Sequence, residues 1–178
     1  GVLNQGVMFY IGNAMLETKL SAGEWENINY EAVPAKANLL YENAFYRHDK
    51  ERRTEYLKKV MLGESKLNAT GLMPYEIVHK IIKDGTRYLF GPLKENVLAE
   101  IMWEIITENG FQNDWGLKDC IVVADGSGSM YTKVSGGSSV SAIEVCNSLA
   151  IYFAQQLQGV FRNKAITFSM TPQFIDLE

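Results

Sequence analysis

Residues 120–129 read Cys-Ile-Val-Val-Ala-Asp-Gly-Ser-Gly-Ser, an apolar run that leads directly into a loop of small polar residues. A continuous apolar run of this kind is typical of a strand buried on both faces of a parallel sheet. Apolar residues then recur at helical spacing from Val140 to Leu157, and Ala165–Phe168 is a second short apolar run. The order strand, loop, helix, strand predicts a βαβ unit in an α/β sheet with helices on both faces.

The sequence before residue 116 predicts helices instead. Ser21–Glu24 has the spacing of a capping box and leads into a short helix over Trp25–Ile28. Longer amphipathic helices are expected to begin at Pro34, Asp49, Pro74 and Pro92. Short polar turns between them predict an antiparallel array. The fold class is therefore α+β in two parts, with an antiparallel α-helical array over residues 1–115 and an α/β sheet over residues 116–178.

Composition excludes several classes of protein. The chain has 178 residues, of which 47% are hydrophobic and 21% charged, which is typical of a globular protein. Its net charge of −4 lacks the basic excess of a chain that binds polyanions mainly through charge. No apolar run is long enough to cross a bilayer and no signal peptide is indicated, so we expect a cytoplasmic protein without a membrane partner. Cys120 and Cys146 are expected to be buried free thiols.

The loop after the first predicted strand carries the residues with the clearest chemistry. Asp125, Ser127 and Ser129 alternate with glycines, so one carboxylate and two hydroxyls can turn toward one point. Ligands of open parallel sheets bind at the carboxyl ends of the strands, where these side chains are expected. Oxygen ligands with a single carboxylate suit Mg²⁺. An Asp or Glu of a partner protein would complete the coordination shell of such an ion.

This loop resembles the first segment of the metal-ion-dependent adhesion site (MIDAS) of von Willebrand factor A domains, Asp-x-Ser-x-Ser after an apolar strand. The expected helix over residues 138–158 and the strand ending Thr167-Phe168-Ser169 match the next elements of that fold. The resemblance implies a Rossmann-like sheet. It also implies that Ser127 and Ser129 bind Mg²⁺ or Mn²⁺ directly, and that Asp125 does so directly or through water.

Several blocks of the helical region carry a second resemblance, and it extends from about residue 16 to the end of the chain. These blocks are Leu20–Ile28, Val33–Ala37, Phe45–Asp49 and Leu72–Val78. They resemble an uncharacterised DUF2828-type family, in which a helical region similar to the Ro/TROVE domain precedes a von Willebrand A-like domain. The resemblance implies a TROVE-like region over residues 1–115 and the first part of an A-like domain over residues 116–178. The family has no established activity.

The match to the adhesion site is partial. A complete site adds a Thr from a later loop and an Asp after a later strand. Thr171 comes too early for that threonine, and the chain ends at Glu178. We therefore expect a truncated α/β domain with an incomplete metal site.

The Ro-like region also raises an RNA-binding alternative. Its densest basic stretch offers four side chains to phosphates: Arg52, Arg53, Lys58 and Lys59. Acidic residues are interleaved with these charges, and Glu55 and Lys59 have the spacing of a helical ion pair. A solvated helix face is therefore the favoured interpretation of this stretch.

No catalytic motif accompanies the serines. The loop matches neither the G-x-S-x-G elbow nor a phosphate-binding P-loop. His48 and His79 both lie in the helical region, where surface or capping roles are expected. The sequence therefore predicts a non-catalytic, intracellular protein-interaction adaptor that recruits a partner's Asp or Glu through a metal site, with RNA binding by the helical region as the alternative.

Overall fold

The structure is a computed structural model that describes residues 14–85, 96–111 and 118–178. Pro92 and the predicted start of its helix lie outside these residues. The described residues form an α+β fold in two compact units, and each is considered by itself. The first contains the residues up to Leu72 with Glu100–Met102, and the second contains Met73–Ala99 and the residues from Trp103 onward. The predicted domain division at residue 115 stays a prediction.

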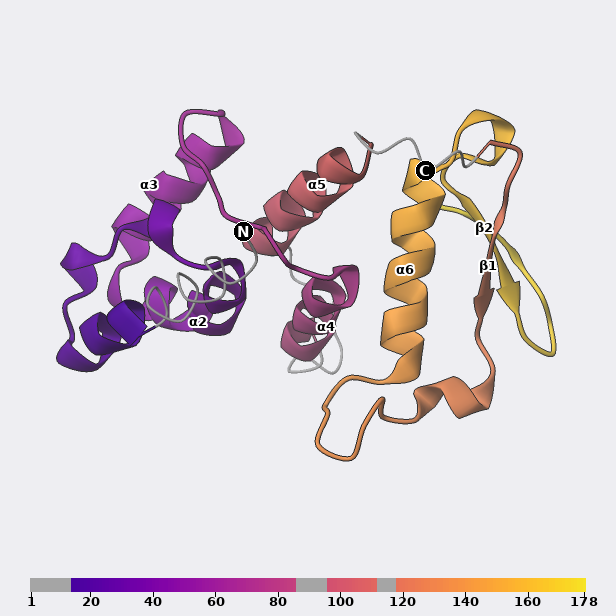
Figure 1. Cartoon of the computed structure of the whole chain (residues 1–178), viewed down its shortest axis with the longest axis horizontal. Helices are drawn as coiled ribbons and strands as arrows, with labels where there is room; N and C mark the ends of the chain where they lie inside the picture. The colour runs from indigo at the N-terminus through magenta and orange to yellow at the C-terminus, as the bar shows by residue number, and fades with distance from the viewer. Residues whose placement is uncertain (1–13, 86–95, 112–117) are drawn as a thin grey trace, which may run out of the picture. The chain divides into compact units, whose positions relative to one another are not determined.

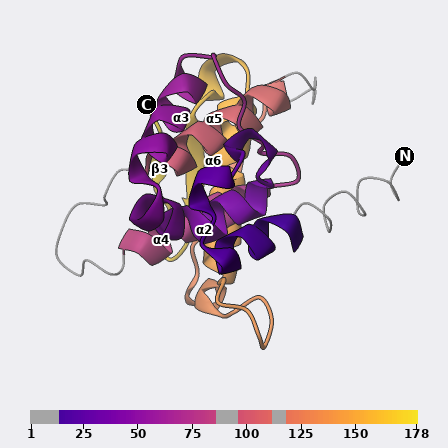
Figure 2. The same ribbon diagram turned by 90° about the vertical axis from the view of Figure 1, so that its left-hand side faces the viewer.

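The first unit is helical (Figure 1). Its elements are a helix over residues 14–22, the 3-10 helices η1 (Trp25–Asn27) and η2 (Tyr30–Ala32), and the α-helices α2 (Ala35–His48) and α3 (Lys50–Met61). Helices α2 and α3 pack against each other (Figure 2). They confirm the two longer helices expected after Pro34 and Asp49.

One detail of the first unit differs from the prediction. Ser21 does not begin the short helix at Trp25, because it lies within the preceding helical segment over residues 14–22. That segment ends at Gly23, whose φ of +73° suits glycine, and η1 follows without a side-chain cap. The capping-box prediction at Ser21 is therefore wrong.

The second unit holds two helices followed by a βαβ unit and a further strand. Its elements are α4 (Pro74–Gly85), α5 (Val97–Phe111), β1 (Val122–Asp125), η3 (Gly128–Tyr131), α6 (Ala142–Gln156), η4 (Gly159–Phe161), β2 (Lys164–Phe168) and β3 (Phe174–Asp176). No helix within the described ranges combines the length and apolar character needed to span a membrane.

The sheet has the strand order β1-β2-β3. Strands β1 and β2 are parallel, with Val122 opposite Ala165 and Asp125 opposite Phe168. This pairing, with α6 as the crossover, confirms the predicted βαβ unit. Strand β3 pairs antiparallel with β2 and was not predicted, because its three residues are too short to show an alternating pattern.

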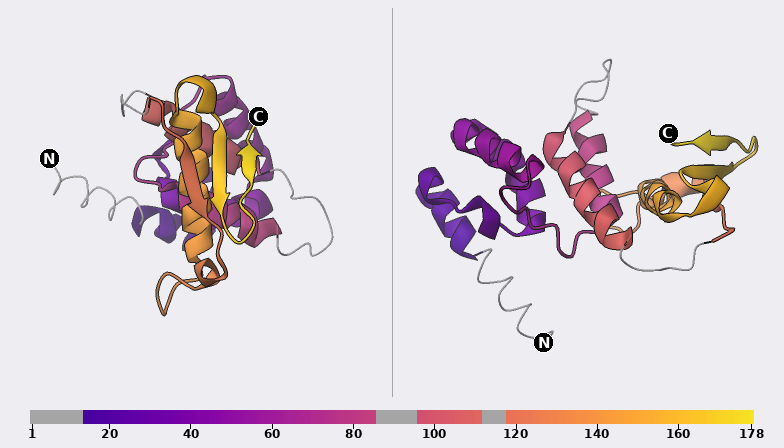
Figure 3. Two further views of the ribbon diagram at one scale, coloured as in Figure 1. Left: turned by 90° about the vertical axis from the view of Figure 1, so that its right-hand side faces the viewer. Right: turned by 90° about the horizontal axis from the view of Figure 1, so that it is seen from above.

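Helix α6 packs on one face of this sheet (Figure 3). Small residues make the contact close: Ala124 and Ala165 of the strands are buried, as are Ala150 and Ala154 of α6. The alternation of side chains along strands places three large residues on the opposite face, where Val123 is 58%, Phe168 63% and Phe174 57% exposed. The expectation of helices on both faces is therefore met on one face only in the part of the chain that is described.

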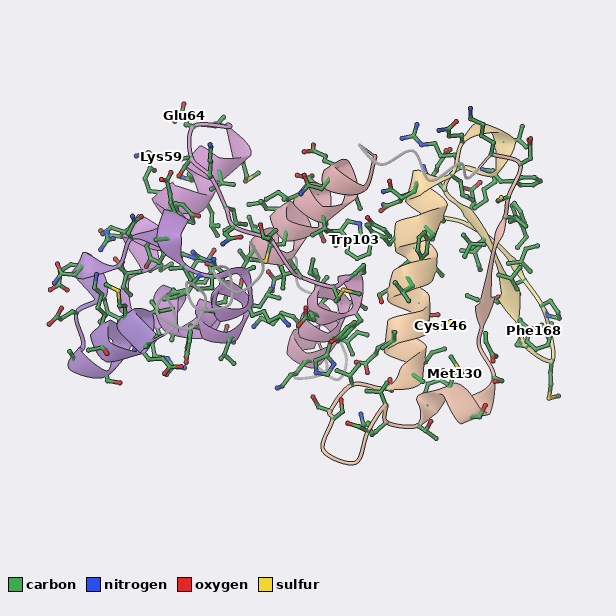
Figure 4. The ribbon with its side chains drawn as sticks, in the orientation of Figure 1. Lys59, Glu64, Trp103, Met130, Cys146 and Phe168 are labelled. Atoms are coloured by element: carbon green, nitrogen blue, oxygen red, sulfur yellow. The ribbon has the colours of Figure 1, made fainter. Side chains whose placement is uncertain are left out.

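Helix α5 packs on α6 within the second unit through polar and close contacts. The Trp103 indole donates to Gln155 Oε1 at 2.9 Å, and Gln156 Nε2 donates to the carbonyl oxygen of Thr107 at 3.2 Å. Trp103 extends from α5 toward α6 (Figure 4). A Cβ atom added at Gly110 would overlap the Tyr152 hydroxyl, so the tip of the Tyr152 side chain lies close against Gly110.

This close approach makes Gly110→Ala a test of the helix packing. Alanine favours a helix over glycine by about 1 kcal/mol. Overpacking against Tyr152 costs about 1–3 kcal/mol, so we expect a net loss of stability in chemical denaturation. In the Tyr152→Phe background, where the clashing hydroxyl is gone, Gly110→Ala should lose less stability. Equal losses in both backgrounds would contradict this packing.

Candidate functional site

The predicted metal loop begins at the carboxyl end of β1, because Asp125 is the last residue of that strand. The backbone N–H of Gly126 donates to the carbonyl oxygen of Phe168 at 2.8 Å, which continues the pairing of β1 with β2 by one residue. This bond fixes where the loop leaves the sheet. The loop therefore starts at the edge where ligands of open parallel sheets bind.

The three oxygen-bearing side chains of the loop lie close together. The Ser127 N–H donates to Asp125 Oδ1 at 2.8 Å, and the hydroxyl oxygens of Ser127 and Ser129 are 3.1 Å apart. Backbone and side-chain hydrogen bonds from Ser127 hold the pKa of Asp125 below its usual value. The carboxylate is therefore ionised at neutral pH and lies beside two neutral oxygen donors. The structure thus brings together all three predicted site residues.

The loop is held in shape by its own hydrogen bonds. Ser127 precedes η3, and its carbonyl accepts from the Met130 N–H at 3.0 Å. The Ser129 carbonyl accepts from both the N–H and the hydroxyl of Thr132, at 3.2 and 2.9 Å. Met130, a residue of η3, lies on the side of η3 that faces α6 (Figure 4). These bonds hold the backbone that carries the two serines.

The spacing of these hydroxyls fits a small divalent ion. Mg²⁺ binds oxygens at about 2.0–2.1 Å in octahedral geometry, which places adjacent ligands about 2.9 Å apart. Ser127 Oγ and Ser129 Oγ are hydrogen-bonded to each other at 3.1 Å, a separation that is also close to this value. Within the described residues, no group of three or more His, Cys, Asp or Glu side chains is placed to hold a metal. An ion at this loop would therefore depend on the serines.

A second polar cluster lies where α6 begins. Both the backbone N–H and the hydroxyl of Ser141 donate to Glu144 Oε2, the hydroxyl at 2.6 Å. The other oxygen, Oε1, lies 2.8 Å from His79 Nδ1 of α4. The second ring nitrogen of His79 is 3.0 Å from the Ser139 hydroxyl. One carboxylate therefore caps α6 and also binds α4.

Sequence reasoning missed this cluster. His79 is 60 residues from Ser139 and 65 from Glu144, so no local motif connects them. The only signal was the spacing of Ser141 and Glu144, a capping box at the start of α6. That signal predicts the helix start but gives no indication of the histidine.

The basic residues of the RNA alternative have different surroundings from those expected. Arg53 has no exposed surface, and its guanidinium lies 5.0–5.4 Å from the ring centres of Tyr30, Phe45 and Tyr56. It cannot contact a phosphate in this fold. The Arg52 side chain is 42% exposed, but it donates to the carbonyl oxygens of Trp25 and Ile28 and pairs with Asp49.

The remaining two basic residues of that set, Lys58 and Lys59, are exposed on α3. Lys59 Nζ lies 3.9 Å from Glu55 Oε1, which is the helical pair that the spacing predicted. The groove beside α3 is lined by more carboxylates than cations: Glu31, Glu51, Glu55 and Glu64 against Arg52 and Lys59. Its charge therefore disfavours a polyanion.

His48 and the two cysteines lie outside the metal loop, and their surroundings are as follows. The His48 ring stacks on Trp25, with 4.3 Å between ring centres. Cys120 is exposed and Cys146 partly exposed, so the prediction that both thiols are buried is wrong. Cys120 is exposed because β1 begins only at Val122. Both cysteines are free thiols, as expected.

Comparisons with known proteins identify the helical region. A family model described as a domain of unknown function (DUF2828) matches residues 13–113. The chain belongs to this family. It is also 23% identical over 173 residues to "Uncharacterized protein L728" of Acanthamoeba polyphaga mimivirus, and this match covers 90% of the chain but 27% of the relative. The comparison with solved structures gives no match.

Because Glu144 caps α6 in its ionised form, we expect the stability of the chain to decrease at acid pH. Burial opposes ionisation of Glu144, but hydrogen bonds from Ser141 and His79 outweigh it and lower its pKa to about 2. In an unfolded chain this pKa returns to about 4.3. The unfolded state then binds more protons, so the stabilisation is complete above about pH 4.3 and is lost as pH falls toward 2.

Denaturation midpoints measured between pH 2 and 6 test this dependence. Glu144→Gln should flatten the slope below about pH 4.3, because the residue can no longer titrate. Glu104→Gln on the exposed surface of α5 is the matched control and should leave the slope unchanged. Equal slopes for the wild type and Glu144→Gln would contradict the role of this carboxylate.

Proposed function

We propose that the protein is a non-catalytic, intracellular adaptor that recruits a partner protein through Mg²⁺ or Mn²⁺ held by Asp125, Ser127 and Ser129. The observation that carries the proposal is the 3.1 Å separation of the two serine hydroxyls beside an ionised carboxylate. These oxygens would form one side of the coordination shell of the ion. The proposal includes a MIDAS-type site in a von Willebrand A-like domain.

The βαβ unit supports the A-like interpretation. The Asp-x-Ser-x-Ser loop leaves the carboxyl end of β1, and α6 then returns the chain to the parallel strand β2. This is the order of elements that the resemblance implies. The match to the DUF2828 family supports the TROVE-like interpretation of the helical region. By resemblance, this family joins a Ro/TROVE-like helical region to a von Willebrand A-like domain.

The net positive charge of a divalent ion bound at the loop would attract a carboxylate of the partner. Asp125 is the single carboxylate among the three proposed ligands, so it neutralises half of a divalent charge. The bound ion would supply the remaining positive charge as an electrophilic contact. A carboxylate of a partner's Asp or Glu would take the place of one of the waters that Mg²⁺ usually keeps, because the ion prefers oxygen ligands.

The RNA alternative has weaker support in the structure. Arg53 is buried, Arg52 holds the backbone of η1, and carboxylates outnumber cations in the groove beside α3. Arg52 is also exposed but is engaged with backbone carbonyls, so Lys58 and Lys59 are the cations of the predicted set that are left to meet a phosphate. Two lysines on one helix provide little of the counterion release that drives binding to nucleic acid.

The metal step can be measured by titrating the chain with Mn²⁺ and following the relaxation of water protons. Asp125→Ala should weaken binding by about tenfold or more, because it removes the only charged ligand. Ser127→Ala and Ser129→Ala should each weaken it by a smaller factor. Ser135→Ala, which removes a hydroxyl from the same stretch outside the motif, is the matched control.

The recruitment step is tested by adding acetate, a minimal probe for an Asp or Glu side chain, to the Mn²⁺-loaded chain. Acetate should displace metal-bound water and lower the relaxation enhancement in the wild type. Acetate should not change the relaxation enhancement of Asp125→Ala, because this variant is expected to bind little Mn²⁺. Unchanged Mn²⁺ affinity in Asp125→Ala would overturn the proposed site.

A further inference from the structure

A serine, a histidine and a carboxylate lie in line outside the metal loop. Ser139 Oγ is 3.0 Å from His79 Nε2, and His79 Nδ1 is 2.8 Å from Glu144 Oε1. Nucleophile and base within hydrogen-bond reach, with the base oriented by a third group, is the signature of an activated nucleophile. All three residues belong to the second compact unit.

The hydrogen bonds of Glu144 determine which atom of His79 carries the proton. Both oxygens of Glu144 accept hydrogen bonds, and its pKa is lowered to about 2, so the carboxylate is ionised and cannot donate. His79 Nδ1 must therefore carry the proton of its bond to Glu144. In the neutral ring Nε2 is then the acceptor, and the Ser139 hydroxyl donates to it. This is the tautomer that a general base requires.

Exposure and local contacts suit a reaction at Ser139. Ser139 is exposed, whereas the side chains of His79 and Glu144 are 20% and 10% exposed. The backbone around Ser139 is fixed, because Lys133 Nζ donates to its carbonyl and the Val140 N–H donates to Ser138 Oγ at 3.0 Å. Ser139 also lies two residues before Ser141, the N-cap of α6, whose positive end favours developing negative charge.

We propose that Ser139 is a nucleophile activated by His79 and Glu144, and that it accepts an acyl group from an activated ester. In the reaction, Ser139 Oγ forms a bond to the acyl carbon and passes its proton to His79 Nε2. The bond between the acyl carbon and the alcohol or phenol oxygen breaks, and His79 returns the proton to that leaving group. The product is an acyl-serine on the loop before α6. This single covalent modification goes beyond the adaptor role and does not depend on it.

p-Nitrophenyl acetate is the probe for this reaction, with EDTA present to separate it from the metal loop. The wild type should release a rapid burst of about one equivalent of p-nitrophenolate per chain. Intact mass should increase by one acetyl group, and peptide mapping should place that group on Ser139. Ser139→Ala should abolish the burst, and His79→Gln should slow it by about 100-fold or more. Ser135→Ala, a hydroxyl deletion at an exposed position of the same loop, should keep the burst rate.

Peptide mapping of the acetylated wild type tests the role of Ser139 even if His79→Gln fails to fold. Acetylation confined to lysines, an unlabelled Ser139, or an unchanged burst in Ser139→Ala would each overturn it. A burst that maps to Ser139 while Asp125→Ala leaves Mn²⁺ affinity unchanged would support this inference and contradict only the proposed metal site.

Discussion

The carboxylate of Glu144 is the interaction on which the second compact unit depends most. One oxygen takes the hydrogen bonds of Ser141 that begin α6, and the other binds His79 of α4. A buried carboxylate is stable only when both oxygens have partners, and here each partner comes from a different segment. The start of α6 and a polar contact between α4 and α6 therefore share one side chain, and His79, which it binds, also contacts Ser139. Hydrogen bonds from Ser141 and His79 lower its pKa to about 2 although burial opposes ionisation.

Helix α6 connects this cluster to the loop that follows β1, because it contacts both the sheet and η3. Alanines on α6 and on both parallel strands allow the helix to lie close to the sheet, while Trp103 and Gly110 of α5 pack on α6 within the same unit. The 3-10 helix η3 that carries Ser129 contacts α6 as well. The backbone of the loop that carries the two serine hydroxyls is therefore held by contacts with the sheet and with α6. Preorganised oxygens of this kind lose little entropy when they bind an ion.

The elements that could be predicted are those with long, regular patterns. The apolar run before Asp125 and the helical spacing after Val140 predicted the parallel βαβ unit, and the position of Asp125, Ser127 and Ser129 in one loop followed from it. Strand β3 was missed because it is too short for a pattern, and the burial of Arg53 was missed because an aromatic cage forms only in the folded chain. Ser139, His79 and Glu144 are far apart in sequence. Only tertiary packing of α4 on α6 brings them together.

The loop at the end of β1 is proposed to bind a divalent cation. Its oxygen spacing, its single ionised carboxylate and its place at the carboxyl edge of the sheet all point to the same use. Anomalous diffraction from crystals soaked in Mn²⁺ tests this most directly. The account predicts a peak about 2.1 Å from the hydroxyl oxygens of both Ser127 and Ser129. A Mn²⁺ peak elsewhere on the chain, with none at this loop, would contradict it.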